Sequence, residues 1–312
     1  MVTNGAMNSI RHPMRLIFLV ILTFTAIAGI VSADAGHRRV IDPTGRTVQV
    51  PVKALRIVAL APSITEMIYA LQQGDRLVGV TRFSNYPPRA NKLPLVGTYI
   101  QPDVERIVAL RPDLVIAIKD GNPLSTVEQL QSIGVPVYAV NPIDLDGVMQ
   151  SMLALGELLG ATHEAHAVVS DMRTRIARVQ ERLAGISRRP KVFFQIGVSP
   201  IVSVGSNTFI HTLITLAGGE NVAAGPMPYP RYSREQVISL APEVIVITSM
   251  ERSALYNQVK AEWMQWPAIP AARNEAIFIA PSDLFDRPSP RLVDALELLV
   301  RHIHPQLFEE RP

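Results

Sequence analysis

The sequence of 312 residues contains no cysteine. The chain therefore has no disulfide, thiolate metal site, iron–sulfur cluster, cysteine nucleophile or lipidated cysteine. The charges are nearly balanced, with 30 Lys and Arg residues and 27 Asp and Glu residues. The sequence also contains no run of five residues with the same charge. A nucleic acid is a poor candidate for a partner of such a chain.

Catalytic motifs are also absent. The sequence has no Gly-x-Ser-x-Gly elbow, no His-Glu-x-x-His zinc motif and no Gly-x-x-x-x-Gly-Lys phosphate loop. His163 and His166 stand three residues apart inside a helical pattern, but no third metal ligand accompanies them. We expect neither an enzyme nor a resident metal or cofactor.

The first 35 residues resemble a secretory signal peptide in their layout. Arg11 and Arg15 precede an apolar run over 16–31, and small residues follow at Ala33 and Ala35. The alternative is a permanent membrane anchor, but the run is shorter than the roughly 20 residues that a spanning helix needs. We predict a signal peptide over 1–35, cleaved after Ala33 or Ala35, and a periplasmic protein without a lipid anchor.

Short apolar segments alternate with helical patterns along the rest of the chain. Buried strands are predicted at 56–60, 77–80, 114–118, 135–140 and 191–195. Strands that alternate with helices in this way are typical of parallel sheets in an α/β fold.

The middle of the chain is helical over 145–160 and 162–183. The second of these helices would be about 33 Å long at about 1.5 Å per residue, which is enough to reach from one lobe to another. We therefore predict an N-terminal α/β lobe over 36–145, interlobe helices over 146–186 and a C-terminal α/β lobe over 187–312.

One internal repeat supports two similar lobes. Residues 104–118 read VERIVALRPDLVIAI, and residues 234–248 read REQVISLAPEVIVIT. Each copy predicts a short helix, a turn marked by proline and a buried strand. Because the copies lie on opposite sides of the long helix, they favour two lobes of related structure.

Several segments resemble a known family, the periplasmic binding proteins for cobalamin and ferric siderophores of ABC importers. The resemblance covers roughly residues 38 to 305 and is closest to the cobalamin-binding members. It is carried by RIVALAPS at 56–63, GVTR at 79–82, YPP at 86–88, ERIVALRPD at 105–113, PYPRYSREQ at 228–236 and SDLFDRPSPR at 282–291.

The resemblance implies two α/β lobes joined by a single long helix, with a ligand held between them. It also implies a protein that binds cobalamin without altering it and delivers it to an inner-membrane permease dimer with a cytoplasmic ATPase. We expect such a protein to be a monomer. The first alternative is a ferric siderophore or haem as the ligand, and the second is a secreted enzyme or chaperone with the same fold.

Glu105 and Glu235 occupy matching positions of the repeat, each in the first turn of its helix. Pro102 suits the first position of one helix, and Ser233 with Gln236 forms a capping box for the other. An acidic residue at a helix N-terminus can simply offset the helix dipole. The resemblance implies a further role, in which the two glutamates dock on arginines of the permease subunits.

The ligand-binding candidates are loop residues that follow strands, because open α/β sheets bind ligands at that edge. Aromatic faces and a few polar groups suit a broad apolar ring system fringed with amides. Where Tyr99 and Tyr229 stand, the cobalamin-binding members carry tryptophan, so a phenol could instead serve a haem or ferric ligand. The candidates are Pro62, Ser63, Tyr86, Tyr99, Tyr229, Asp283, Phe285 and Arg287.

Overall fold

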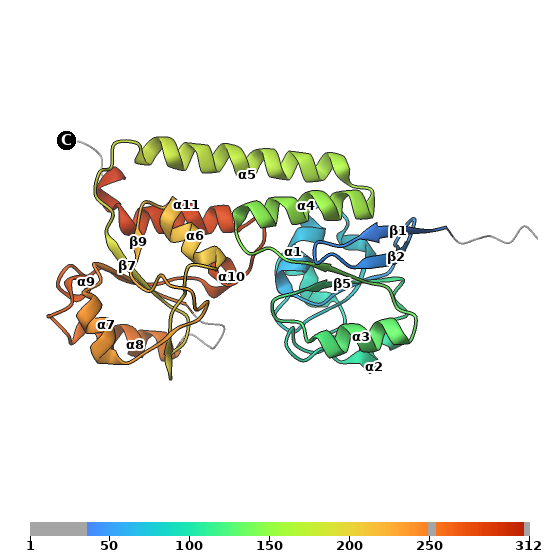
Figure 1. Cartoon of the computed structure of the whole chain (residues 1–312), viewed down its shortest axis with the longest axis horizontal. Coiled ribbons are helices and arrows are strands. Elements are labelled where there is room, and N and C mark those ends of the chain that lie inside the picture. Colours follow the sequence, from blue (N-terminus) through green and yellow to red (C-terminus); the bar gives the residue numbers. More distant parts are fainter. Residues whose placement is uncertain (1–35, 249–253, 309–312) are drawn as a thin grey trace, which may run out of the picture. The chain divides into compact units, whose positions relative to one another are not determined.

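A computed structural model describes residues 36–248 and 254–308, and the predicted signal peptide lies outside the described residues. Arg38–Pro312 forms one compact unit, which contains two α/β lobes (Figure 1). Among the described residues, no helix combines the length and the apolar character needed to cross a bilayer.

The first lobe is built on a parallel sheet with the strand order β4-β3-β5-β6. Alternate residues of its strands face opposite sides, so that Ile116 packs toward α1 and Val115 toward α2 and α3. Both faces are therefore buried, which explains why the strands read as continuous apolar runs. The elements are β3 (Ile57–Ala59), α1 (Pro62–Ala70), β4 (Leu77–Val80), α2 (Val104–Ala109), β5 (Leu114–Ile118), α3 (Leu124–Ser132) and β6 (Val137–Val140).

The second lobe repeats this plan with the strand order β9-β7-β11-β12. Phe194 of β7 packs toward α6 and α11, and Phe193 packs on the opposite face toward α7 and α8. The elements are β7 (Lys191–Gln195), α6 (Phe209–Leu216), β9 (Glu220–Asn221), α7 (Arg234–Leu240), β11 (Val244–Ile247), α8 (Ala254–Met264), α9 (Pro270–Arg273), β12 (Ile277–Ile279), α10 (Ser282–Phe285) and α11 (Leu292–Ile303).

The internal repeat corresponds to α2 with β5 in one lobe and α7 with β11 in the other. An acidic residue of the repeat accepts an equivalent backbone hydrogen bond in each lobe. Asp113 Oδ2 accepts a 2.8 Å hydrogen bond from the backbone N–H of Leu55, just before β3. Glu243 Oε1 accepts one of 3.1 Å from the N–H of Lys191, at the start of β7. The prediction of two related lobes is confirmed.

The helix caps of the repeat were predicted only in part. The capping box of Ser233 and Gln236 is present at the start of α7. Pro102 is not the first residue of α2, and that prediction is wrong. Asp103 caps the helix instead, because its carboxylate accepts a 3.1 Å hydrogen bond from the N–H of Arg106.

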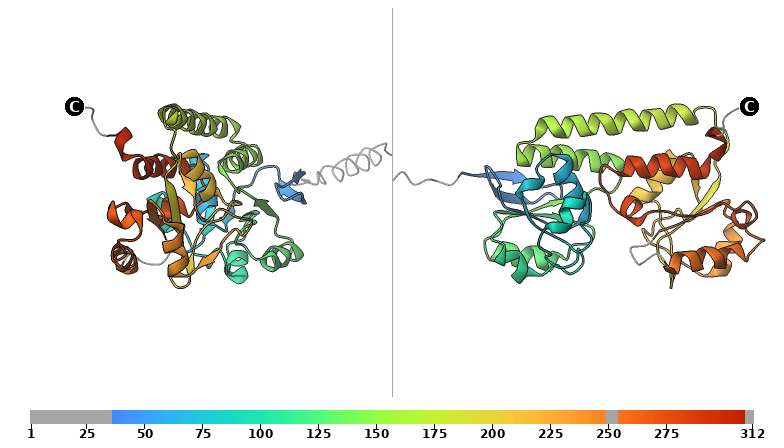
Figure 2. Two further views of the ribbon diagram at one scale, coloured as in Figure 1. Left: turned by 60° about the vertical axis from the view of Figure 1, so that its left-hand side comes forward. Right: turned by 180° about the vertical axis from the view of Figure 1, so that it is seen from behind.

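The lobes are connected through α4 (Leu145–Leu159) and α5 (Thr162–Leu183). Gly160, with φ of 69°, ends α4 in the left-handed conformation and turns the chain back. The 22 residues of α5 then run along both lobes, in contact with α1 of the first and α11 of the second (Figure 2). Arg175 of α5 donates from Nε to Glu297 of α11 at 2.9 Å. The two-lobed α/β fold with one long connecting helix is confirmed, while the exact lobe boundaries at 145 and 186 stay predictions.

Smaller elements complete the fold. A two-stranded sheet pairs β1 with β2, and an antiparallel pair joins β8 to β10 beside the second lobe. Their bounds are β1 (His37–Ile41), β2 (Thr47–Pro51), β8 (Ile201–Val202) and β10 (Arg231–Tyr232), with 3-10 turns at Gly74–Arg76, Pro88–Lys92 and Pro305–Leu307.

Candidate functional site: a cleft between the lobes

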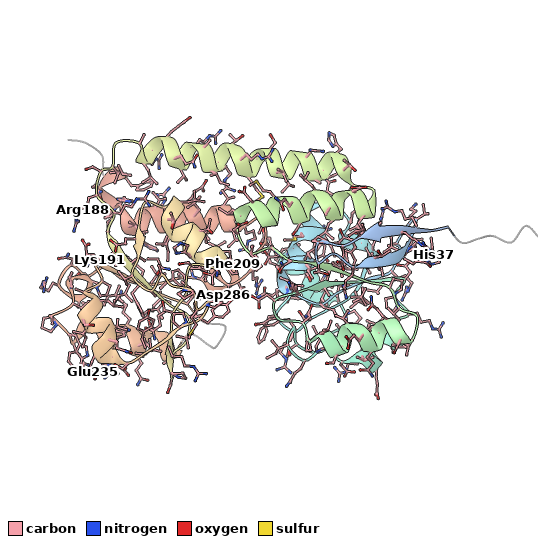
Figure 3. The ribbon with its side chains drawn as sticks, in the orientation of Figure 1. His37, Arg188, Lys191, Phe209, Glu235 and Asp286 are labelled. Carbon is pink, nitrogen blue, oxygen red and sulfur yellow. The ribbon has the colours of Figure 1, made fainter. Side chains whose placement is uncertain are left out.

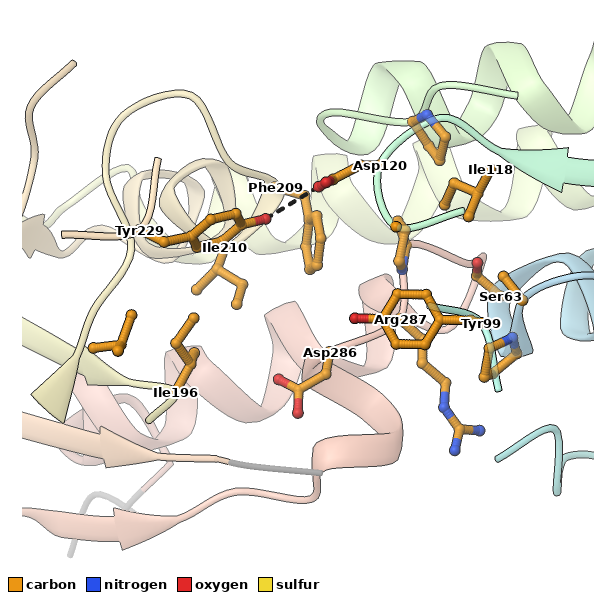
Figure 4. A pocket seen from close by; sticks show the side chains of 16 residues that line it. Ser63, Tyr99, Ile118, Asp120, Ile196, Phe209, Ile210, Tyr229, Asp286 and Arg287 are labelled. Atoms are coloured by element: carbon orange, nitrogen blue, oxygen red, sulfur yellow. Dashed lines mark hydrogen bonds between the residues drawn. The ribbon is translucent and has the colours of Figure 1, made fainter. Parts of the chain in front are cut away.

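A cavity of about 370 Å³ lies between the two lobes (Figure 4). The first lobe contributes Pro62 and Ser63, which follow β3, and Asp120, which follows β5. The second lobe contributes Ile196, which follows β7. The cavity therefore lies at the carboxyl ends of the parallel strands of both sheets, where α/β folds present their ligand sites.

Five of the eight predicted ligand-binding residues line this cavity: Pro62, Ser63, Tyr99, Tyr229 and Arg287. Tyr99 and Tyr229 come from different lobes (Figure 4). Tyr229 is held in place by the segment leading into β10, where the carbonyl of Pro230 accepts a 2.9 Å hydrogen bond from the N–H of Ser203. The structure thus brings one aromatic ring from each lobe to the same cavity.

The other three predicted residues do not line the cavity. Phe285 is fully buried, and its ring packs against Phe194 with 5.6 Å between centroids. Tyr86 is 44% exposed and lies under the guanidinium of Arg291, 3.8 Å from the ring centroid. Asp283 pairs with Arg287. A ligand in the cavity would touch Tyr86 and Asp283 only if it extended beyond the lining residues, whereas Phe285 belongs to the hydrophobic core.

Eleven of the 16 lining residues were not among the predicted ligand contacts, and Asp120, Phe209 and Asp286 are the acidic and aromatic residues among these eleven. Asp120 had a usable signal, because it is the second residue after a buried strand and is followed by a glycine, Gly121. Phe209 begins α6 after a stretch without a strand pattern, so nothing local marks it as part of a site. In Figure 3 Phe209 and Asp286 lie on the side of the second lobe that faces the first.

Neutral phenols line the cavity. The Tyr229 hydroxyl donates a 3.1 Å hydrogen bond to Asp120 Oδ2 of the other lobe. Burial and, after it, the negative charge of Asp120 together raise the pKa of Tyr229 to about 12. Burial, with the charges of Asp120 and Asp286, also raises the pKa of Tyr99. Both tyrosines therefore act as hydrogen-bond donors near neutral pH.

Asp286 is the most perturbed acid of the cavity. Burial raises its pKa to about 7, although the hydrogen bond from Thr248 and the charge of Arg287 act in the opposite direction. Thr248 Oγ1 donates to Asp286 Oδ1 at 2.6 Å. Close to neutral pH this carboxyl group is present in both forms, so it can accept a hydrogen bond from a ligand or donate one.

Arg287 forms part of the cavity wall, but its guanidinium faces protein groups. It is 5% exposed, and Nη1 donates to Glu66 Oε1 and to Asn85 Oδ1, each at 2.8 Å. Nη2 donates to the carbonyl of Phe83 at 2.9 Å and to Asp283. A direct bond from this guanidinium to a ligand amide, as the sequence suggested, would require some of these contacts to break.

Metal-ligating groups do not gather in the cavity. Within the part of the chain that the structure describes, no three His, Asp or Glu residues are grouped so that they could hold a metal ion. His163 and His166 are exposed on α5, and neither lines the cavity.

The two repeat glutamates lie at a separate location. Glu105 and Glu235 are both exposed in the first turns of α2 and α7. These helices lie at the edge of each lobe away from α5 (Figure 1), and Glu235 is labelled there in Figure 3. Hydrogen bonds from its own backbone N–H and from Ser233 lower the pKa of Glu235, so it is charged at neutral pH.

Comparison with known proteins identifies a matching family, a similar sequence and two similar structures. The model of a family described as periplasmic binding protein matches residues 57–284. A vitamin B12-binding protein of Yersinia pestis (strain Pestoides F) is 33% identical over 252 residues, which cover 80% of this chain and 86% of the relative.

Two solved structures are similar over nearly their whole length. The periplasmic vitamin B12-binding protein of Vibrio cholerae is 29% identical with a TM-score of 0.72, over 82% of this chain and 99% of that one. The periplasmic haem-binding protein of Roseiflexus sp. RS-1 is 28% identical with a TM-score of 0.73, over 81% of this chain and 98% of that one.

Proposed function

Because the chain belongs to the periplasmic binding protein family, whose members bind substrates without converting them, we propose that its interlobe cleft binds a corrinoid, cobalamin. The observation that carries this proposal is a mostly apolar cavity of about 370 Å³ between the two lobes, with a few hydrogen-bonding side chains in its wall. Such a cavity falls within the range of ligand pockets, which are mostly apolar with a few placed polar groups. The likeness to relatives named for vitamin B12 binding supports the same ligand.

The polar groups of the cavity suit a ring system fringed with amides. Asp120 can accept hydrogen bonds from amide N–H groups, and the hydroxyls of Ser63 and Tyr99 can donate to amide carbonyls. Ile196, Phe209 and the tyrosine rings supply apolar contact for the body of the ring. A ligand that enters between the lobes exchanges the hydrogen bond between Tyr229 and Asp120 for its own.

The second candidate is haem or a ferric siderophore, favoured by the tyrosines and by the similar haem-binding structure. Tyrosine can ligate haem iron. To do so as a phenolate, however, Tyr99 or Tyr229 would have to ionise against burial and against the negative charge of Asp120, both of which raise the pKa. These surroundings favour the corrinoid.

The same proposal includes delivery to a membrane partner. Glu105 and Glu235 are exposed carboxylates on equivalent helices of the two lobes. Two such groups would fit basic pockets on the two halves of an inner-membrane ABC permease, with a cytoplasmic ATPase behind it. A secretory signal over 1–35 would place the protein in the periplasm, where it would act as a monomer.

Titration of the purified protein with cyanocobalamin, haemin and a ferric siderophore tests the ligand. We expect saturable binding of one cyanocobalamin, followed by visible absorbance, and weaker binding of the other two compounds. Tight binding of haemin or of the siderophore without binding of cyanocobalamin would show that the ligand is the second candidate and not cobalamin.

A further inference from the structure

A buried carboxylate from the first lobe is bonded entirely to groups of the second. Glu66 of α1 is 4% exposed. Its Oε1 accepts from Arg287 Nη1 at 2.8 Å and from Arg291 Nη1 at 3.2 Å. Its Oε2 accepts from Ser289 Oγ at 2.6 Å. Three donors from the segment between α10 and α11 therefore converge on one side chain of α1.

The arginine at the centre of this cluster is bonded back to the first lobe as well. Arg287 donates to Asn85 Oδ1 and to the carbonyl of Phe83, which both follow β4. Asn85 Nδ2 in turn donates to Asp283 of the second lobe at 2.8 Å. Arg287 also lines the cavity, and in Figure 4 its guanidinium extends away from Tyr229. Arg287 therefore connects the cluster to the wall of the cavity.

We propose that Glu66, Arg287, Ser289 and Arg291 form an interlobe clasp that fixes the width of the cleft before any ligand binds. Opening the lobes about α5 would break the hydrogen bonds from all three donors to the Glu66 carboxylate at once. Hydrogen bonds between charged groups are among the strongest polar contacts in proteins, so their loss opposes opening. The cleft is then a preformed slot, which favours a rigid, flat ligand because little reorganisation opposes binding.

The clasp rests on the proposed function only in taking the cavity as the ligand site, and its test needs no ligand. The chain has no cysteine, so two introduced cysteines can carry spin labels without background. Suitable labelling sites are Glu128 on α3 and Ala261 on α8, which are exposed and lie one in each lobe, so the labelled protein carries Glu128→Cys and Ala261→Cys. Pulsed electron resonance then reports the distance between the lobes in solution.

The labelled parent is expected to give one narrow distance distribution in the absence of ligand. A broad or multimodal distribution in the parent would overturn the clasp directly. Glu66→Gln removes the charge at nearly constant shape and should broaden the distribution toward longer distances. If that variant does not fold, Glu66→Met combined with Arg287→Met removes both charges and replaces them with apolar side chains of similar length.

Asp42→Asn is the matched control. Asp42 is also a buried acid, 2% exposed, but it bonds to Thr44 Oγ1 at 2.6 Å and to Arg46 Nη2 at 2.7 Å within the first lobe. It should lower stability and leave the interlobe distance unchanged. A folded Glu66 variant with the parent's distribution would refute the clasp, whichever ligand the cleft binds.

Discussion

The buried acid of the cleft makes the stability of the protein depend on pH in a defined direction. The pKa of Asp286 rises from 3.8 in the unfolded chain to about 7 in the folded protein. Between these two values the folded state holds a proton that the unfolded state has lost, so stability falls as pH rises. Each pKa unit corresponds to about 1.4 kcal/mol, so the full loss above the folded pKa is about 4 kcal/mol.

Asp286→Asn should remove this loss, because an amide cannot ionise and its oxygen can still accept the bond from Thr248. Relative to the parent, the variant should therefore be more stable, and by more at high pH. The expected gain is about 2 kcal/mol near pH 5 and about 4 kcal/mol near pH 8. Urea unfolding of both proteins at the two pH values measures the gain. A difference that does not change with pH would show that Asp286 is not held protonated by burial.

Three further outcomes are expected. Tyr229→Ala should weaken ligand binding about tenfold or more. Tyr229→Phe loses only the hydrogen bond to Asp120 and should change the affinity by much less. Equal losses of affinity for both variants in a calorimetric titration would contradict a role for the ring. Glu105→Ala with Glu235→Ala should leave ligand binding intact and impair cellular uptake of cobalamin, so normal uptake would remove the docking role. Phe285→Ala should destabilise the fold by about 3–5 kcal/mol in denaturant unfolding, because the ring is fully buried; a loss below about 1 kcal/mol would contradict its place in the core.

Much of the fold could be predicted from the sequence because it is encoded locally. The strands at 114–118 and 191–195 are buried on both faces and therefore read as unbroken apolar runs. The helix at 162–183 carries its own periodic pattern and agrees with the prediction at both ends. The repeat of Asp113 and Glu243 reflects the same anchoring of the neighbouring strand in each lobe.

The candidate site was less predictable because its geometry depends on contacts between distant segments. Pro62 and Ser63 could be predicted from the sequence, since they begin the helix that comes shortly after a buried strand. Arg287 was predicted as a ligand contact, but its partner Glu66 is 221 positions away and no local pattern couples them. Asp286, the residue before Arg287, was not predicted, although its side chain faces the cavity. The guanidinium of Arg287 faces protein groups, because adjacent residues at the end of a short helix point in different directions.

A crystal structure of the complex with cyanocobalamin would decide whether the cleft is a preformed cobalamin site. We predict that the corrin ring lies in the interlobe cavity in contact with Tyr99 and Tyr229, with the lobes within about 1 Å of their unliganded arrangement. A corrin bound elsewhere on the surface, or lobes rotated apart around it with the bond between Glu66 and Arg287 broken, would contradict a preformed cobalamin slot.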